Sequence, residues 1–301
     1  MHRPLRGRFL SRDQLFLHLG CLGAMGLAAV VLQGRTAAWQ FSLIFLLSAL
    51  AGCASLVFLQ RIPDIEAHEN VVKSNTRVPW KEIVTYPPFL TLCIFNVLYM
   101  VSLGSLGVFT VAFLKAQGFT ESTILAFTAL AFVAAVVSLP IVGRVVDRVG
   151  SKIVLASALV LFAVVLTAWL LIAGHVVEPT VPLLSAISFA GGMAGANFGL
   201  ANVRIVMNTM PPMGRSHFFA FYSVITSIGL GLTPIVWGVC LDAIGDYESH
   251  WRGLDLNRFS IYFGALLLLT IATTLFGTVL HDRSTAFSPA KIPNDELALS
   301  P

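Results

Sequence analysis

The sequence predicts an all-α fold, a polytopic membrane helix bundle with about eight transmembrane helices. Three observations support this fold class. Hydrophobic residues make up 56% of the 301-residue chain and charged residues only 11%, against about 25% charged residues in a soluble domain. The apolar stretches reach about 20 residues, the length that crosses a hydrocarbon core of about 30 Å. Lysine and arginine gather in alternate connections, as expected when one side of the membrane retains them.

Eight stretches are long and apolar enough to be spans. Each carries its apolar residues around the whole helix rather than along one stripe, which is typical of helices surrounded by lipid and by other helices. The predicted spans are residues 14–33, 37–60, 89–114, 120–142, 153–174, 181–203, 216–241 and 259–280.

A long polar insert at residues 61–88 divides the chain. The part before it, residues 1–60, holds two predicted spans, and the part after it, residues 89–281, holds six. Within the insert, residues 80–84 are expected to form a short interfacial helix. The last segment, residues 282–301, is polar and interrupted by proline, so we expect a disordered tail.

The distribution of cations predicts the orientation of the spans. Fifteen lysines and arginines fall on one side, and four, Arg35, Lys115, Arg252 and Arg258, fall on the other. Short loops with excess positive charge stay in the cytoplasm, and the predicted number of spans is even. Both termini and the insert are therefore predicted to be cytoplasmic, residues 242–258 are predicted to be external, and the expected location is the plasma (inner) membrane of a bacterium.

A charged stretch, 143-GRVVDRVGSK-152, connects the fourth and fifth predicted spans. Its first glycine lets two helix ends approach, and its last glycine can adopt the left-handed conformation that a tight turn needs. The acid can accept free N–H groups from the start of a neighbouring helix, while the cations hold the turn at the cytoplasmic face. An ordinary positive loop with an incidental acid is the alternative. The residues concerned are Gly143, Asp147, Arg148, Gly150 and Lys152.

Those residues fit the pattern G-x-x-x-D-R-x-G-x-[RK] and resemble the signature loop of the major facilitator superfamily (MFS). A second stretch, 211-PPMGRSHFFAFYSVITSIGLGLTPIVWG-238, is similar to the start and body of helix 11 in that family. Members are secondary transporters with twelve helices in two halves of six. If the insert is the central loop, the resemblance implies helices 5–12, an incomplete MFS-type bundle in which residues 1–60 are a remnant of the N-terminal half.

The resemblance implies secondary active transport of a small solute by rocker-switch alternating access. The charged loop would then be a gate. Asp147 would lie beside the start of the first helix, residues 9–14, and accept from free amides there or from Arg12. Arg148 would reach Asp13. A non-transporting membrane protein or an inactive transporter remnant is the alternative, because four helices of the family pattern are absent.

No acidic or basic residue lies near the middle of a predicted span, so the spans offer no carboxylate for proton coupling. His18 is the candidate proton relay, with a hydrogen bond between helices as its alternative role. Polar residues that share helix faces are candidates for the solute path, with bonding between packed helices as the alternative. They are Asn96 and Tyr99 in the third span, Asn197 and Asn202 in the sixth, and Tyr222 and Thr226 in the seventh.

The absent helices would leave two gaps. The faces that carry Asn96, Tyr99 and Asn197 are expected to border an open groove, and Arg215, which would meet the missing copy of the loop, is expected to be exposed. An open groove cannot enclose a solute. The chain alone is therefore expected not to concentrate a solute unless it pairs with a separate N-terminal half or with a second copy.

Other classes of function have little support. The stretch 250-HWRGLD-255 matches the H-x-x-x-x-D pattern of acyltransferases, but it lies in an external connection without a supporting domain, so no enzyme activity is expected. Four cysteines without a CxxC motif or a Cys/His cluster indicate no metal and no cofactor. The net charge of +4 is explained by the cytoplasmic connections, so nucleic acid is not an expected partner. The expected partners are a small solute and the lipid bilayer.

Overall fold

The structure, a computed structural model, describes residues 6–31, 38–61, 85–210, 215–245, 247–251 and 253–280. This part of the chain contains eight helical segments long and apolar enough to cross a membrane, so the predicted all-α membrane bundle is confirmed. The helices are α1 (Arg6–Val31), α2 (Ala38–Leu59), α4 (Pro87–Leu103), α5 (Leu106–Ala116), α6 (Glu121–Val149), α7 (Ser151–Ala173), α8 (Val181–Thr209), α9 (Arg215–Ile244) and α10 (Arg258–Gly277). An antiparallel hairpin of β1 (Ser249–Trp251) and β2 (Leu254–Leu256) precedes α10.

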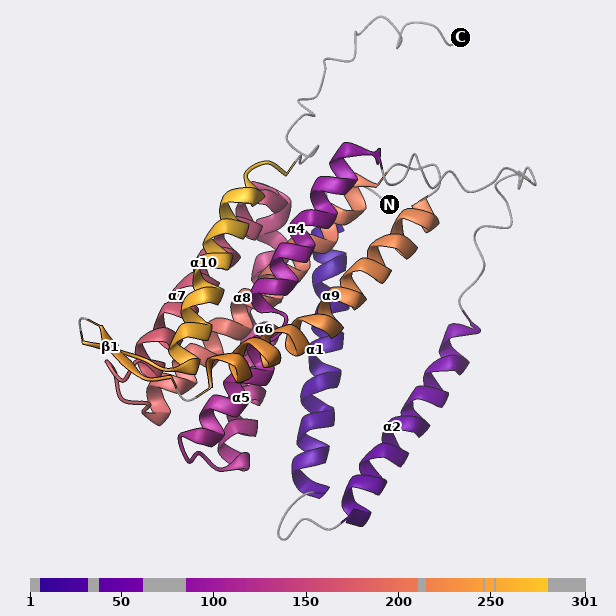
Figure 1. The fold of residues 1–301 in the computed structure, drawn as a ribbon. Coiled ribbons are helices and arrows are strands. Elements are labelled where there is room, and N and C mark those ends of the chain that lie inside the picture. Colours follow the sequence, from indigo (N-terminus) through magenta and orange to yellow (C-terminus); the bar gives the residue numbers. More distant parts are fainter. Residues whose placement is uncertain are drawn as a thin grey trace, which may run out of the picture.

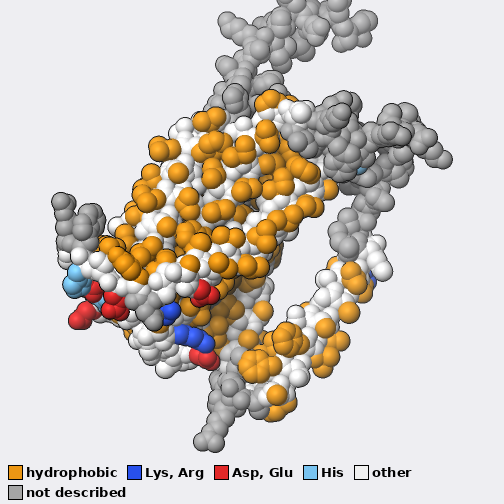
Figure 2. Space-filling view, viewed as in Figure 1, with side chains coloured by type: hydrophobic (Ala, Val, Ile, Leu, Met, Phe, Trp, Pro, Cys, Tyr) orange, Lys and Arg blue, Asp and Glu red, His pale blue; other side chains and the backbone are white. Residues whose placement is uncertain are grey.

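Helices α4 to α10 form a bundle, and α1 lies along one side of it (Figure 1). α6 packs against α1 and α8, while α7 packs against α8 and α10. α2 stands apart from the bundle. It is joined to α1 by a hydrogen bond of 2.8 Å from Gln40 Nε2 to the Val31 carbonyl oxygen. Hydrophobic side chains are spread over most of the visible surface of the helices, and the charged side chains in this view gather at the hairpin end of the bundle (Figure 2), as expected where lipid is the solvent.

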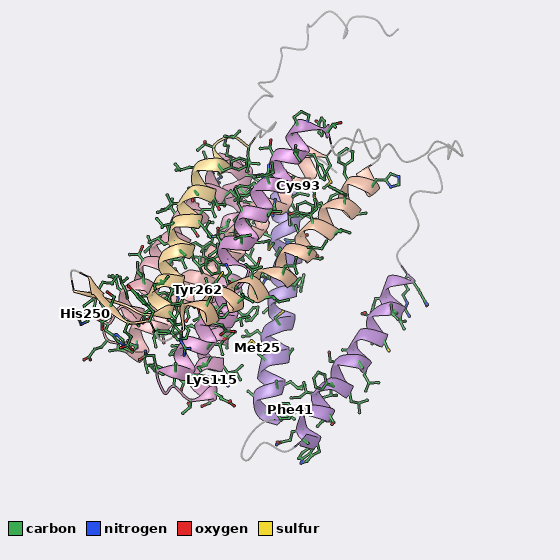
Figure 3. The ribbon with its side chains drawn as sticks, in the orientation of Figure 1. Met25, Phe41, Cys93, Lys115, His250 and Tyr262 are labelled. Atoms are coloured by element: carbon green, nitrogen blue, oxygen red, sulfur yellow. The ribbon has the colours of Figure 1, made fainter. Side chains whose placement is uncertain are left out.

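The two ends of the bundle are defined by different contacts. At one end, termed the Asp147 end, α1 begins and α6, α8 and α10 finish. The Lys152 ammonium there donates to the carbonyl oxygens of Thr278 and Leu280, at 2.6 and 3.0 Å, and so caps the end of α10. At the other end, termed the hairpin end, lie β1, β2 and the connection from α5 to α6. Figure 3 shows His250 and Lys115 at this end, with Cys93 near the opposite one.

The third span, predicted at residues 89–114, runs from Pro87 to Ala116. It consists of two helices, because two residues separate α4 from α5. In an unbroken helix the Val101 carbonyl would accept from the Ser105 amide. Here the indole N–H of Trp237 in α9 donates to that carbonyl at 2.9 Å. The Ser105 hydroxyl lies 2.8 Å from the Tyr262 hydroxyl in α10. Side chains of two other helices therefore satisfy polar groups at the break.

The predicted connection at residues 143–152 is much shorter than expected. α6 continues through most of it, and only Gly150, with a φ of 90°, separates α6 from α7. This φ lies in the region that favours glycine. The spans predicted at residues 14–33 and 181–203 also extend further, to Arg6 and Thr209. Charged residues near these ends remain helical because a helix does not have to stop where the hydrocarbon core does.

Most of the predicted polar insert and the whole predicted tail lie outside the described residues. Residues 62–84 include the expected interfacial helix at 80–84, and residues 281–301 include the expected disordered tail. The side chain of Arg215, expected to be exposed, is also outside the described set. The domain boundaries near residues 60, 88 and 281 stay predictions.

α6 and α8 touch through their backbones at Gly192. A Cβ atom at this position would overlap the backbone of Ala131 and lie 2.5 Å from its Cα atom. Small residues at such crossings let membrane helices approach closely, and close packing is a main source of stability in lipid. The α6–α8 interface therefore depends on the absence of a side chain at Gly192.

Gly192→Ala is expected to lower the free energy of unfolding by about 1–3 kcal/mol, because the added methyl group overpacks the interface. Gly199→Ala is the matched control in the same helix, since a Cβ there meets nothing within 4 Å. Denaturant titration in detergent micelles measures both. Equal stability of the two variants would show that the two backbones are not in contact at Gly192.

Candidate functional site

A largely enclosed carboxylate joins three helices at the Asp147 end. Asp147, near the end of α6, accepts through Oδ1 from the backbone N–H of Gly7 in α1 at 3.0 Å, and from Arg204 Nη1 in α8 at 2.9 Å. The side chains of Asp147 and Arg204 are only 11% and 14% exposed. Amides in the first turn of a helix have no intrahelical partner and carry partial positive charge. The carboxylate thus meets one full and one partial positive charge. We term Gly7, Asp147 and Arg204 the latch.

Two glycines bring the latch together. A Cβ at Gly7 would lie 2.5 Å from Asp147 Oδ1 and 2.8 Å from the Gly143 carbonyl oxygen. A Cβ at Gly143 would lie 2.6 Å from the Cβ of Ser11. Any larger residue at either glycine would hold α1 and α6 apart and would remove the Gly7 amide from Asp147. The absence of a side chain at Gly143 thus allows α1 to approach α6 closely.

The structure places Asp147 against the first turn of α1, although at Gly7 rather than at residues 9–14. The shift arises because α1 begins before the predicted span. Arg12, Asp13 and Arg148 are exposed. Among the described residues, no ion pair joins Asp147 to Arg12 or Arg148 to Asp13.

The cation that pairs with Asp147 is Arg204, one of the fifteen lysines and arginines predicted to lie on the cytoplasmic side. A signal was available in the stretch 201-ANVRIVM-207, where one arginine stands among apolar residues inside a helix. A charge in that setting needs a partner. Asp147 Oδ2 is enclosed and has no hydrogen-bond partner within the described chain, so the carboxylate depends on its contacts through Oδ1.

Three of the predicted solute-path residues bond to one another. Asn202 Nδ2 donates to Asn96 Oδ1 at 2.8 Å and to the Tyr222 hydroxyl at 3.1 Å. The Tyr222 hydroxyl donates to Asn96 Oδ1 at 3.0 Å. These residues, termed the polar hub, join α4, α8 and α9. Asn96 is fully buried, so the expectation of an open groove beside it is wrong: α8 and α9 cover the face that was expected to be open.

The remaining solute-path candidates lie in different settings. The Tyr99 ring stacks on Phe198 of α8, with 3.6 Å between ring centroids. The Thr226 hydroxyl donates to backbone carbonyls of its own helix. Asn197 Oδ1 is enclosed and unpaired among the described residues. A role of any of the six candidates in a solute path stays a prediction.

His18, the candidate proton relay, is bonded within its own helix. Its Nδ1 lies 2.7 Å from the Gln14 carbonyl oxygen, and because a carbonyl only accepts, Nδ1 carries the hydrogen. The ring packs against Phe132 of α6, with centroids 5.9 Å apart. The bond lies within α1 rather than between helices, contrary to the alternative role, and the relay stays a prediction.

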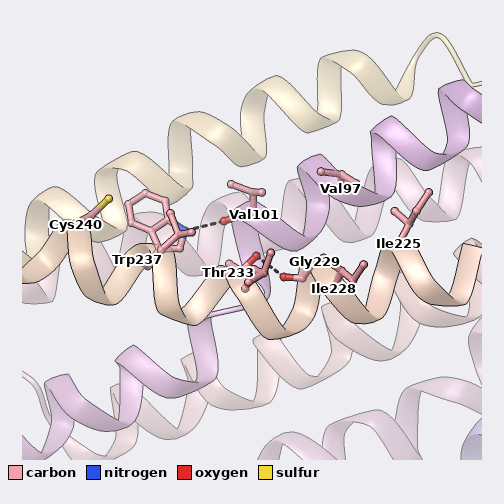
Figure 4. A pocket seen from close by; sticks show the side chains of 10 residues that line it. Val97, Val101, Ile225, Ile228, Gly229, Thr233, Trp237 and Cys240 are labelled. Carbon is pink, nitrogen blue, oxygen red and sulfur yellow. Dashed lines mark hydrogen bonds between the residues drawn. The ribbon is translucent and has the colours of Figure 1, made fainter.

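An apolar groove of about 470 Å³ lies between α4 and α9 (Figure 4). Val97 and Val101 line it from α4, and Ile225, Thr233 and Trp237 are among its residues from α9. The Thr233 hydroxyl and the Trp237 indole both donate to backbone carbonyls. The groove therefore offers apolar contact without free hydrogen-bonding groups from these side chains, which suits contact with lipid chains.

The H-x-x-x-x-D match at the hairpin end has a structural explanation. His250 and Asp255 are directly opposite each other in the register of β1 and β2, and the His250 ring contacts the Asp255 carboxylate. The second carboxylate oxygen lies 3.0 Å from His175 Nδ1, beyond the end of α7. Asp255 thus fastens the hairpin to α7. Within the described residues, no group of histidine, cysteine and acidic side chains has the arrangement of a metal site.

Tyr222→Phe is expected to cost about 0.6 kcal/mol of unfolding free energy, and at most about 1.7, the range measured for bonds between membrane helices. In a double-mutant cycle with Asn202→Leu, the two effects should be coupled, because the side chains share a hydrogen bond. Thr226→Val is the control, since its hydroxyl bonds only to its own helix. Coupling of Asn202 to Thr226 as strong as to Tyr222 would contradict the hub.

Comparison with known families brings these features together. The Major Facilitator Superfamily matches residues 108–297, which include Asp147, Arg204 and helices α6 to α10. No curated protein matches the chain. The match covers more than half of the 301 residues, and together with eight apolar helices it shows an integral membrane protein. The chain belongs to the major facilitator superfamily of membrane transporters.

Proposed function

We propose that the chain takes part in secondary active transport of a small solute, by access that alternates between the two faces of the membrane. The latch is the observation that carries this proposal. A buried ion pair adds little stability compared with apolar packing, and its better-attested use is to select one of two arrangements. At the Asp147 end, the latch joins α1 to α6 and α8 through the Asp147 carboxylate. Its loss would free α1 to move.

The Asp147 end is proposed to face the cytoplasm of a bacterial cell, with both termini on that side of the inner membrane. Short loops rich in lysine and arginine remain there. The described cations at the Asp147 end, besides Arg204, include Arg8, Arg12, Arg144, Arg148 and Lys152. Lys115 and Arg258 lie at the hairpin end among the carboxylates of Glu121, Glu178, Asp242, Glu248 and Asp255.

Alternating access needs a second bundle opposed to α4–α10. Within the described chain, α1 and α2 are the helices outside that bundle, and α2 stands apart. We propose that a second copy of the chain or a separate N-terminal half supplies further opposed helices, and that transport belongs to this assembly. The proposal includes no enzymatic step.

Asp147→Asn is expected to open the latch, because a neutral amide leaves the Arg204 charge without compensation. The reporter is Ser11→Cys in a chain whose native cysteines are replaced by alanine, since Ser11 is 5% exposed and lies at the contact with Gly143. Its reaction with a membrane-impermeant maleimide should become about tenfold faster, which corresponds to about 1.4 kcal/mol. The free energy that corresponds to this change in rate is smaller than the full cost of breaking a buried ion pair, about 3–5 kcal/mol.

Asp13→Asn is the matched control, because it makes the same change at an exposed carboxylate of α1. Transport itself is tested with the full chain in liposomes, against a panel of radiolabelled solutes under a proton or sodium gradient. Uptake above that of empty liposomes should appear with the assembled form and fall in Asp147→Asn. Equal maleimide rates in both variants, with no uptake by any assembled form, would favour a non-transporting membrane protein. Accumulation by a demonstrated monomer would contradict the need for a second bundle.

A further inference from the structure

Four arginines flank the crossing of α1 and α6 at the Asp147 end. Two contacts fix this crossing. Gly7 of α1 lies against Asp147 of α6. Four residues later in α1, Ser11 lies against Gly143, which is four residues earlier in α6, so the two helices are antiparallel. Each arginine directly follows one of these contact residues in the sequence. They are Arg8, Arg12, Arg144 and Arg148, and we term them the arginine cluster.

Helix geometry brings the arginine cluster to one side of the crossing. One step along a right-handed α-helix turns the side chain by about 100°. Because α1 and α6 are antiparallel, the same step in each helix turns both side chains toward the same side. α8 packs elsewhere on α6, since it touches Ala131, about 140° around the helix from Arg144. All four arginines are accordingly exposed.

No carboxylate of the described chain neutralises the arginine cluster. Within the described residues, none of its side chains makes an ion pair or a hydrogen bond. By contrast, Arg204 pairs with Asp147, and Lys152 donates to carbonyl oxygens at the end of α10. Like charges four residues apart on one helix repel each other, and each helix contributes such a pair. An anion between the two helices would lower this repulsion.

Apolar side chains continue the same faces of both helices beyond the arginine cluster. In α6, Ile141 lies seven residues before Arg148 and is 60% exposed. In α1, Phe16 lies four residues after Arg12 and is 70% exposed. Residues four or seven apart share a face of a helix. A ligand at this crossing would therefore meet cations at the end of the bundle and apolar side chains farther along the helices.

We propose that the arginine cluster binds the headgroup phosphate of an anionic phospholipid, whose acyl chains lie along the exposed apolar faces of α1 and α6. Guanidinium groups bind phosphate through paired N–H donors. Basic pockets between membrane helices suit anionic headgroups. A free phosphate has no acyl chains and would leave the apolar faces unused, so the two-part surface favours a lipid.

The proposed lipid has a consequence for the latch. A phosphate held by arginines of both helices ties α1 to α6 beside the contact of Gly7 with Asp147. A ligand that binds one arrangement better than another shifts the equilibrium toward it. Anionic lipid therefore favours the closed latch. The inference does not require that the chain transports a solute.

The experiment uses the full chain in phosphatidylcholine liposomes with a spin-labelled lipid, and electron paramagnetic resonance measures the motionally restricted fraction of the label. Spin-labelled phosphatidylglycerol should be restricted more than spin-labelled phosphatidylcholine. Arg144→Gln should lower the association constant of phosphatidylglycerol relative to phosphatidylcholine about fivefold, the contribution of one cation near a membrane surface. Arg8→Gln should have the same effect, because the site belongs to both helices.

Arg258→Gln is the matched control, since it makes the same change at an exposed arginine of the hairpin end. It should leave the relative association constant unchanged. Restriction of spin-labelled phosphatidylcholine to the same extent in every variant shows that each one is folded and inserted. Inorganic phosphate in excess, at constant ionic strength, should not displace spin-labelled phosphatidylglycerol.

A second measurement tests the link between lipid and latch. Ser11→Cys reports opening of the latch, and Asp13→Cys is an exposed reference on the same helix. The ratio of their maleimide rates cancels the effect of bilayer charge on the reagent. This ratio should be lower in bilayers that contain phosphatidylglycerol than in phosphatidylcholine alone, and Arg144→Gln should remove the difference. An equal ratio in both bilayers would reject the link.

Three outcomes of the resonance experiment would overturn the lipid site. The first is equal restriction of the two labelled lipids by the unmodified protein. The second is an equal loss in Arg144→Gln and Arg258→Gln, which would indicate only a general attraction between a cationic protein and an anionic bilayer. The third is displacement by inorganic phosphate, which would assign the arginine cluster to a free anion. None of these results depends on solute uptake, so the site and the proposed transport can fail separately.

Discussion

The hydrocarbon core of a bilayer contains no water, so each polar group of a membrane helix must find its partner within the protein. This constraint explains the main contacts of the chain. Where the third span breaks, the Trp237 indole and the Tyr262 hydroxyl meet the polar groups at the break. Where Asn96 is buried, Asn202 and Tyr222 bond to it.

The same constraint holds for the full charge of the Asp147 carboxylate in the latch. Asp147 is tolerated at the edge of the apolar region because Arg204 and the first-turn amide of α1 reach it. Glycines at positions 7 and 143 leave a smooth crossing between α1 and α6. Such a crossing can separate without unlocking interdigitated side chains.

The break in the third span depends on contacts from two other helices. If α4 and α5 were one helix, the Val101 carbonyl would accept from the Ser105 amide. Instead, the Trp237 indole of α9 donates to the Val101 carbonyl, and the Ser105 hydroxyl bonds to the Tyr262 hydroxyl of α10.

The sequence by itself determined the membrane bundle, the approximate spans and the importance of Gly143, Asp147 and Gly150, because span length, charge placement and turn conformation depend on local composition. It did not reveal Arg204 as the partner of Asp147, since the two are 57 residues apart and are joined only by packing of α8 on α6. The helix break and the polar hub were also decided by the tertiary structure. Each depends on which side chain of another helix reaches a polar group, and periodicity along one helix carries no information about that.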